Sequence, residues 1–250
     1  MKKSLVFLVV FFATILSVYS QCNIPSNLGN TPVWTEYPNL IEVKYSSNPD
    51  CYIYAKVCYR TVNGEKQVIV SEWKLGEMTT AEYIDWVVNC SQGYVAKKEM
   101  ISARAIDIAI NFDNIFQDDE EIPFCGETLD YYAVFESNCE TEFFPDFDND
   151  PDPFDDVVPY NSVSCNGIGY CKYKYSYCSE DVDGNGILDL VVDRKTMTDS
   201  RYECPDKYQE NDLIDCLPKD CYVDRRFRSP SVTDVQTYNN DAAFFSANEL

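Results

Sequence analysis

The amino-acid sequence predicts a mostly β protein of the α+β class. In it, disulfide bonds staple antiparallel hairpins or a sandwich, with a short helical insertion around residues 79–112. Three observations support this class. Two segments alternate in the manner of strands, and each is followed by a turn and a second branched segment. Helical periodicity lies between them, behind an N-cap signal. Twelve cysteines, an even number, follow an apolar N-terminal segment.

Residues 1–20 have the features of a secretory signal peptide. Lys2 and Lys3 precede an apolar run over residues 5–16, and Val18 and Ser20 stand at the −3 and −1 positions of a cleavage site. The run is shorter than the roughly 20 residues that a membrane-spanning helix needs. We therefore expect a secreted or extracellular protein, with the periplasm as an alternative, and no membrane span.

Residues 52–75 are expected to form the first hairpin. Residues 52–60 are rich in aromatic and β-branched side chains, which favour strands. Asn63 and Gly64 follow, and both residue types tolerate the positive φ angles of a tight hairpin turn. Residues 67–75 then return as the second strand.

A first helix is expected after this hairpin. Thr79 and Glu82 have the spacing of a capping box, in which each residue satisfies a backbone N–H of the first turn. We expect this helix to end at Gly93, since glycine commonly terminates helices. Its apolar stripe consists of Tyr83, Ile84, Val87 and Val88.

A second helix is expected in the segment that follows. Residues 106–112 also alternate like a strand, but Arg104, Asp107 and Asn111 fall together on one face of a helix, and this favours the helix. The apolar stripe at helical spacing consists of Ile101, Ala105, Ile108 and Phe112.

Acidic residues dominate the middle of the chain, because residues 105–171 contain 17 Asp or Glu and no Lys or Arg. Residues 131–136 are expected to form a strand. Residues 140–156 combine carboxylates with prolines, so we expect a loop or linker there. The sequence is thus divided into a β-rich region with the helical insertion (21–144), an acidic Pro-containing linker (145–156), a Cys-rich β region (157–228) and a tail (229–250).

The Cys-rich region opens with a second expected hairpin. Residues 171–178 alternate strictly, with tyrosine at positions 173, 175 and 177. A Gly-rich acidic loop follows, and residues 188–195 return as the second strand. The alternation places the strand aromatics in the core, although exposed Tyr and Trp beside carboxylates would also suit sugar binding.

All twelve cysteines follow residue 20, and we expect them to form disulfides. Without a CxxC pair or a histidine, neither zinc nor thioredoxin-type chemistry is favoured. Cys51 and Cys58 lie seven residues apart on one expected strand, roughly 23 Å along it, whereas a disulfide needs Cα atoms within roughly 7 Å. The same argument separates Cys171 from Cys178, and Cys216 and Cys221 flank a turn-forming run that would close a small loop. The expected disulfide cysteines are Cys22, Cys51, Cys58, Cys90, Cys125, Cys139, Cys165, Cys171, Cys178, Cys204, Cys216 and Cys221.

Residues 181–189 carry the pattern of a cation-binding loop. Oxygen-bearing side chains occupy positions 1, 3, 5 and 9, and position 7 would offer its backbone carbonyl. Calcium takes six to eight oxygen ligands, and the glycine at position 6 permits the sharp turn that gathers them. A metal-free glycine-rich turn is the alternative, since Asp, Asn and Gly also favour turns. The expected calcium ligands are Asp181, Asp183, Asn185, Ile187 and Asp189.

This segment resembles the DxDxDG calcium loops of EF-hand, dockerin, thrombospondin type 3 and integrin-like propeller repeats. Val192 stands where the EF-hand has a bidentate glutamate, and strands are expected on both sides. The resemblance is therefore closer to the propeller, thrombospondin and dockerin-like loops, and implies a calcium ion that bridges two extended segments. Residues 146–152 fit either a second, looser calcium segment or a solvated linker.

Composition excludes two classes of function. A formal net charge of −22 would repel nucleic acid. Without histidine, neither a Ser-His-Asp triad nor an HExxH zinc site can form.

We therefore expect a secreted, non-enzymatic, disulfide-rich and calcium-stabilised protein with a binding or structural role, such as an adhesive surface protein or a filament subunit. Its partners would be a protein or glycan at the cell surface, or further copies of itself. The alternative is a secreted hydrolase with two catalytic carboxylates, such as a glycosidase, although no local motif selects such a pair.

Overall fold

The computed structural model describes residues 22–46, 48, 51–76, 79–117, 122–127, 131–137, 139–143, 161–164, 169–182, 184–186, 188–199, 204, 207–208, 211–218, 221 and 225–229. The expected signal peptide, the expected linker at 145–156, Cys165 and the tail beyond residue 229 lie outside the described residues.

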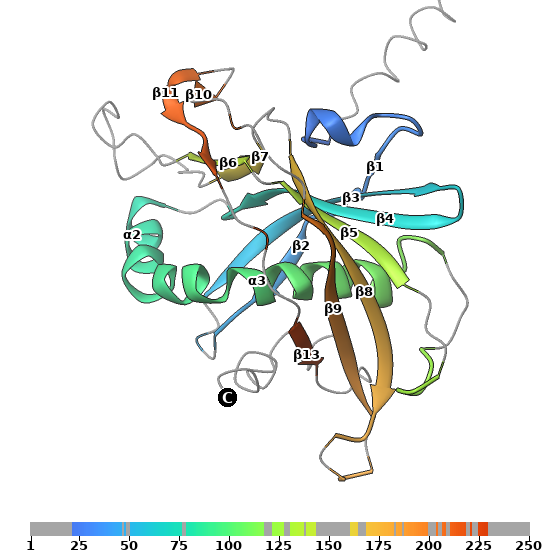
Figure 1. Ribbon diagram of the computed structural model, residues 1–250. Helices are drawn as coiled ribbons and strands as arrows, with labels where there is room; N and C mark the ends of the chain where they lie inside the picture. Colours follow the sequence, from blue (N-terminus) through green and yellow to red (C-terminus); the bar gives the residue numbers. More distant parts are fainter. Residues whose placement is uncertain are drawn as a thin grey trace, which may run out of the picture.

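Strands dominate the described part of the chain, which confirms the mostly β class (Figure 1). In chain order they are β1 (Thr35–Glu36), β2 (Ile41–Lys44), β3 (Tyr52–Val62), β4 (Glu65–Lys74), β5 (Tyr131–Ser137), β6 (Cys139–Phe143), β7 (Asn161–Ser164), β8 (Tyr170–Glu180), β9 (Asp189–Asp199), β10 (Lys207–Tyr208), β11 (Asn211–Asp215), β12 (Leu217–Pro218) and β13 (Arg225–Ser229). The helical elements are η1 (Ser26–Leu28), α2 (Thr80–Asn89), α3 (Ser91–Asp107) and the π-helical turn η2 (Ile108–Phe112).

Eleven of these strands form one sheet, in the order β12-β6-β7-β4-β5-β8-β9-β13, with β3 pairing with β4 and also with β1 and β2. The pairing of β4 with β5 is parallel, and the other named pairs in the described sheet are antiparallel. β10 and β11 form a separate two-stranded sheet. The parallel pair brackets the helical insertion, because antiparallel neighbours need only a turn whereas parallel ones need a crossover.

Both predicted hairpins are confirmed. β3 and β4 pair in antiparallel register around a turn in which Asn63 and Gly64 have φ angles of 51° and 86°, as the sequence predicts. β8 and β9 form the second hairpin. Tyr173, Tyr175 and Tyr177 of β8 are buried in the main core, so the strict alternation does place aromatic side chains there.

The helical insertion is also confirmed, with one correction. Thr79 and Glu82 form the capping box: the Glu82 carboxylate accepts the Thr79 N–H at 2.7 Å, and the Thr79 hydroxyl accepts the Glu82 N–H at 3.4 Å. The prediction that the first helix ends at Gly93 is wrong, because the break falls at Cys90 and Gly93 lies inside α3. Cys90 has non-helical backbone angles and forms a disulfide with Cys51, which directly precedes β3. The helix break was expected at a glycine, and it lies instead at a residue that is covalently bonded to a distant segment.

The core lies between α3 and one face of the sheet (Figure 1). Ile101, Ala105 and Ile108 of the predicted stripe are buried there, but so are Arg104 and Asp107, which form an ion pair. The helix is therefore buried on more than its apolar stripe. The opposite sheet face is covered by the N-terminal segment, in a second cluster around Trp34 and Phe135.

Part of the acidic middle is strand, which corrects one expectation. The loop or linker was expected to begin at residue 140, yet β6 extends to Phe143 and pairs with β7 and β12. Backbone hydrogen bonds do not depend on side-chain charge, and Cys139 anchors this strand through its disulfide with Cys204. Strands from residues 21–144 and from residues 157–228 belong to the same sheet, because β4 pairs with β7 and β5 with β8.

Five disulfides have both partners in the described part of the chain. They are Cys22–Cys58, Cys51–Cys90, Cys125–Cys178, Cys139–Cys204 and Cys171–Cys221. Cys216 is also disulfide-bonded. The geometric exclusions of Cys51 from Cys58 and of Cys171 from Cys178 are confirmed. The small loop between Cys216 and Cys221 is wrong, because Cys221 instead ties the chain ahead of β13 to the start of β8.

Candidate functional site

The predicted calcium loop connects β8 to β9, at the end of the longest hairpin in the described structure. In Figure 1 this hairpin extends past α3, and its loop lies at the bottom of the molecule, away from the helices. Pairing between the strands continues up to Glu180 and Asp189, which face each other across the loop base. The loop is therefore held by a rigid ladder on both sides, as the sequence predicts.

Asp181, the first expected ligand, folds its carboxylate over the loop. One oxygen accepts the backbone N–H of Asn185 at 3.0 Å and the other accepts that of Gly186 at 2.9 Å. Gly184 and Gly186 have φ angles of 67° and 81°, in the left-handed region that favours glycine. The two glycines thus allow the backbone to turn around the Asp181 carboxylate.

Asp189, the last expected ligand, points back toward the same loop. Its Oδ2 accepts the backbone N–H of Val182 at 3.4 Å, and the residue is 5% exposed. The structure therefore turns the carboxylates at positions 1 and 9 toward backbone of the same turn. A buried carboxylate such as that of Asp189 is costly without a cation or hydrogen-bond donors, and here the Val182 N–H is one such donor.

Of the three other expected ligands, one lies within the described residues. Asn185 lies in the loop and is exposed, whereas Asp183 and Ile187 lie outside the described residues. Among the residues that are described, no three Asp, Glu or Cys side chains come close enough together to hold a metal ion. A complete calcium shell therefore depends on Asp183 and on the Ile187 carbonyl.

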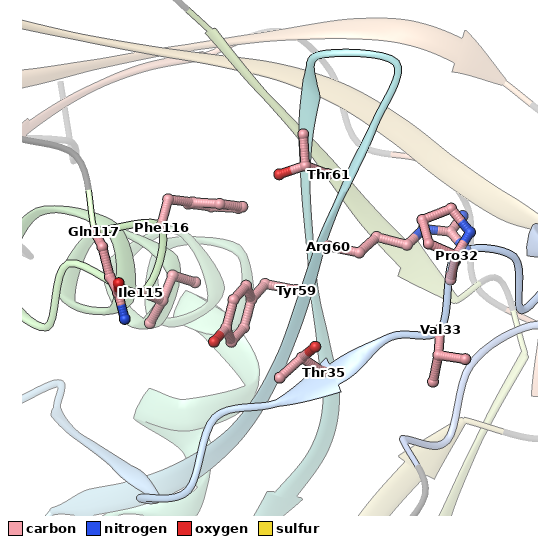
Figure 2. Close-up of a pocket in the computed structure, with 9 residues that line it drawn as sticks. All are labelled: Pro32, Val33, Thr35, Tyr59, Arg60, Thr61, Ile115, Phe116 and Gln117. Atoms are coloured by element: carbon pink, nitrogen blue, oxygen red, sulfur yellow. Dashed lines mark hydrogen bonds between the residues drawn. The ribbon is translucent and has the colours of Figure 1, made fainter.

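A second candidate site is a pocket of about 330 Å³ beside β3. It lies between β1, β3 and the segment that follows η2 (Figure 2). Its lining residues are Pro32, Val33, Thr35, Tyr59, Arg60, Thr61, Ile115, Phe116 and Gln117. The volume is at the lower end of the roughly 300–1,000 Å³ typical of small-molecule sites.

Aromatic rings form one wall of this pocket. The Tyr59 and Phe116 rings meet edge to face at 5.5 Å, and Phe116 also packs against Tyr132 at 5.6 Å. Tyr132 in turn contacts Tyr177 of the core at 5.7 Å. The pocket wall is thus the partly exposed end of a continuous aromatic cluster.

Arg60 also lines the pocket, but Figure 2 shows its side chain extending toward Pro32, on the side of β3 opposite to Tyr59 and Thr61. Its guanidinium donates to Gln67 Oε1 at 2.8 Å and to the carbonyls of Gly29, Pro32 and Leu28 at 2.9–3.1 Å. It also stacks over the Trp34 ring at 4.2 Å. Burial lowers the pKa of Arg60 from its ordinary value. Its observed role is to clamp the N-terminal segment onto the sheet.

The segment that carries Phe116 has unusual backbone geometry. It follows the π-helical turn η2, and both Asn114 and Gln117 have left-handed φ angles, 45° and 55°. Residues other than glycine rarely adopt this backbone conformation. Those that do are found most often at active sites and ligand-binding segments. The Gln117 N–H bonds back to the Asn114 carbonyl at 2.8 Å, which closes a tight turn around Ile115 and Phe116.

Sequence reasoning did not identify this pocket. Its residues come from three separate segments, and no local motif joins them. The strand alternation that places Tyr59 on one face of the sheet was visible in the sequence, but the position of Phe116 across from it depends on how η2 ends.

Within the described residues, no helix has the length and apolar character needed to cross a membrane. Comparisons of the chain with protein-family models, with curated proteins and with solved structures find no match.

Proposed function

We propose that this chain is a secreted, non-enzymatic protein in which residues 181–189 bind calcium and rigidify the β8–β9 hairpin, for a binding or structural role outside the cell. The observation that carries the calcium proposal is the inward orientation of Asp181 and Asp189 around a turn with two left-handed glycines. Carboxylates at positions 1 and 9 of such a loop are ligands that calcium prefers.

The extracellular setting is supported by the disulfides. Five bonds link segments 36 to 65 residues apart in sequence. Disulfides persist in oxidising compartments and are rare in the reducing cytosol. The apolar leader at residues 1–20 points to the same setting.

The partner in this proposal is a protein or glycan at a cell surface, or a further copy of the chain. Among the described residues no observation favours the hydrolase alternative, and the lining of the pocket contains no carboxylate. Glu136 and Asp107 are buried carboxylates, but each lies next to an arginine in the core.

The test of calcium binding is a thermal unfolding series of the oxidised mature protein with and without several millimolar calcium. A ligand that binds only the native state stabilises it by about 2.7 kcal/mol at a hundred times its Kd, so Tm should rise. Magnesium should substitute poorly because it requires a tighter octahedron. Asp183→Ala should remove most of the rise.

Salt provides the control against diffuse binding to the many other carboxylates. At about 1 M salt the Debye length falls to about 3 Å, which screens diffuse attraction but not chelation. Asp193→Ala, a change to a partly exposed carboxylate on β9 outside the loop, is the matched variant. A calcium-induced shift that survives Asp183→Ala at high salt would show that residues 181–189 are only a turn.

A further inference from the structure

We infer that the pocket between β1, β3 and residues 115–117 binds one ring of a neutral saccharide. This deepens the proposed function, on which it rests for its extracellular setting, by naming a class of ligand and a site for it. The site is separate from the calcium loop, so the two proposals fail independently.

The charges at the pocket select an uncharged ligand. Among its nine lining residues the only ionised side chain is Arg60, and that guanidinium is engaged by three backbone carbonyls, by Gln67 and by the Trp34 ring. An anion would therefore have to displace existing hydrogen bonds. A cation would find no carboxylate in the lining, and the one charged lining residue, Arg60, is itself positive.

The lining also selects a ligand that has one apolar face and several hydroxyl groups. Figure 2 shows Tyr59 and Thr61 from β3 and Phe116 from the opposite side directed toward the same space, with Thr35 below them. Aromatic rings contact the C–H face of a sugar, while hydroxyl and amide groups exchange hydrogen bonds with its hydroxyls. The hydroxyls of Thr35 and Thr61 and the amide of Gln117 are exposed at the rim and supply such groups. A purely apolar occupant would bury these groups without partners.

The aromatic wall is already in place before a ligand arrives. Phe116 is held between Tyr59 and Tyr132, and its neighbour Ile115 is buried in the core. The left-handed residues Asn114 and Gln117 fix the turn that presents it. Binding would therefore require little ordering of side chains, which is the condition under which a small pocket gives measurable affinity.

The experiment is an NMR titration of the ¹⁵N-labelled, oxidised mature protein with neutral disaccharides (cellobiose, chitobiose, maltose and lactose), and with glucuronate and a sulfated monosaccharide as charged comparators. We expect at least one neutral sugar to shift the amide signals of Thr35, Thr61 and Gln117 in the millimolar range. Phe116→Leu should weaken this binding about tenfold, because it removes the ring and keeps an apolar side chain. Thr61→Val, which removes one hydroxyl at a solvent-exposed position, should weaken it severalfold.

Phe124→Leu is the matched control, since Phe124 is an exposed phenyl ring that does not line the pocket. Its sugar affinity should equal that of the unmodified protein. The inference is overturned if none of the neutral sugars shifts these three amides at tens of millimolar, if the charged sugars bind as tightly, or if Phe124→Leu and Phe116→Leu weaken binding equally. If sugar binding fails in this way but calcium still raises Tm, the saccharide inference is wrong and the calcium proposal is unaffected.

Discussion

The guanidinium of Arg194 lies 3.7 Å from the centre of the Tyr173 ring, in a position with no exposure to solvent. The same group is 3.4 Å from the carboxylate of Glu136, whose other oxygen accepts a hydrogen bond from Ser102 at 3.1 Å. Arg194 belongs to β9, Tyr173 to β8, Glu136 to β5 and Ser102 to α3. One buried charge therefore links three neighbouring strands to the helix that covers them.

Removing that charge should be among the most damaging single changes in the protein. Arg194→Met leaves Glu136 buried without its cation, and breaking a buried pair in this way costs about 3–5 kcal/mol. The double variant Glu136→Gln/Arg194→Met should recover part of the loss, because no ionised group is then left alone. Guanidinium-induced unfolding of the oxidised proteins measures the free energy of unfolding of the unmodified protein, of Arg194→Met and of the double variant.

Lys195→Met is the control for this cycle. Lys195 is the next residue on the same strand, with a side chain 61% exposed and an ion pair to Asp193 at 3.0 Å. Exposed pairs contribute about 0–1 kcal/mol. An equal loss of stability in Lys195→Met and Arg194→Met would contradict the argument from burial.

Asp107 should make stability fall as pH rises through mildly acidic values. Burial raises the pKa of this carboxyl from 3.8 to about 6, and Arg104 at 3.6 Å and Asn111 at 2.8 Å only partly oppose the shift. Tyr177 of β8 is a further titratable group that interacts with it, and the pKa of Tyr177 is raised mainly by burial and additionally by the charge of Asp107. Between about pH 4 and pH 6 the folded protein then binds a proton that the unfolded chain has released. The free energy of unfolding therefore decreases with rising pH across this window.

Asp107→Asn tests this dependence, because it keeps the shape of the side chain and removes the proton equilibrium. The decrease attributable to Asp107, on the order of 2–3 kcal/mol, should disappear from unfolding curves recorded between pH 4 and pH 7. Asp85→Asn, an exposed position on α2, should leave the pH profile as it was. If both variants keep the profile of the unmodified protein, Asp107 does not carry it.

The disulfide between Cys51 and Cys90 should stabilise the junction of α2 and α3 in particular. It closes a loop of 39 residues, for which the chain-entropy argument gives about 4 kcal/mol. Cys51→Ala/Cys90→Ala should lose stability of that order in denaturant. Hydrogen exchange should also accelerate across residues 80–90, which pack on the core through Tyr83 and Trp86.

Cys125→Ala/Cys178→Ala is the comparison, with a separation of 53 residues and attachment to β8 instead of the helices. It should lose a similar free energy but leave exchange in α2 unchanged relative to global unfolding. Faster exchange across α2 in both variants would mean that the helix is not held locally by Cys51–Cys90.

Local patterns in the sequence were sufficient to predict the local elements. The Asn63–Gly64 turn, the Thr79–Glu82 capping box and the alternation of residues 171–178 each act over a few residues, and each has the predicted structure. The distance along one extended strand was also enough to exclude the Cys51–Cys58 pairing. The actual disulfide partners depend on tertiary contacts, as for Cys171 and Cys221, which lie 50 residues apart. No local sequence pattern indicates such a pairing.

The candidate sites divide in the same way. The proposed calcium loop is contiguous, so its spacing could be read from the sequence, and the structure adds the hydrogen bonds of Asp181 and Asp189 to the loop backbone. The pocket joins Thr35, Tyr59 and Phe116 from three segments. Its shape depends on a π-helical turn and on left-handed backbone at Asn114 and Gln117, which hydrophobic periodicity does not reveal.

The disulfides that cross the acidic middle of the chain determine what a protease can do to this molecule. Cys125 and Cys139 precede residues 144–160, and their partners Cys178 and Cys204 follow them. Cleavage anywhere in that interval would leave both fragments covalently joined, and also paired through β4–β7 and β5–β8. A nicked molecule would run as two bands on a reducing gel and as one on a non-reducing gel. Wherever it meets extracellular proteases, the protein could thus be cut once in its most acidic stretch and remain a single body.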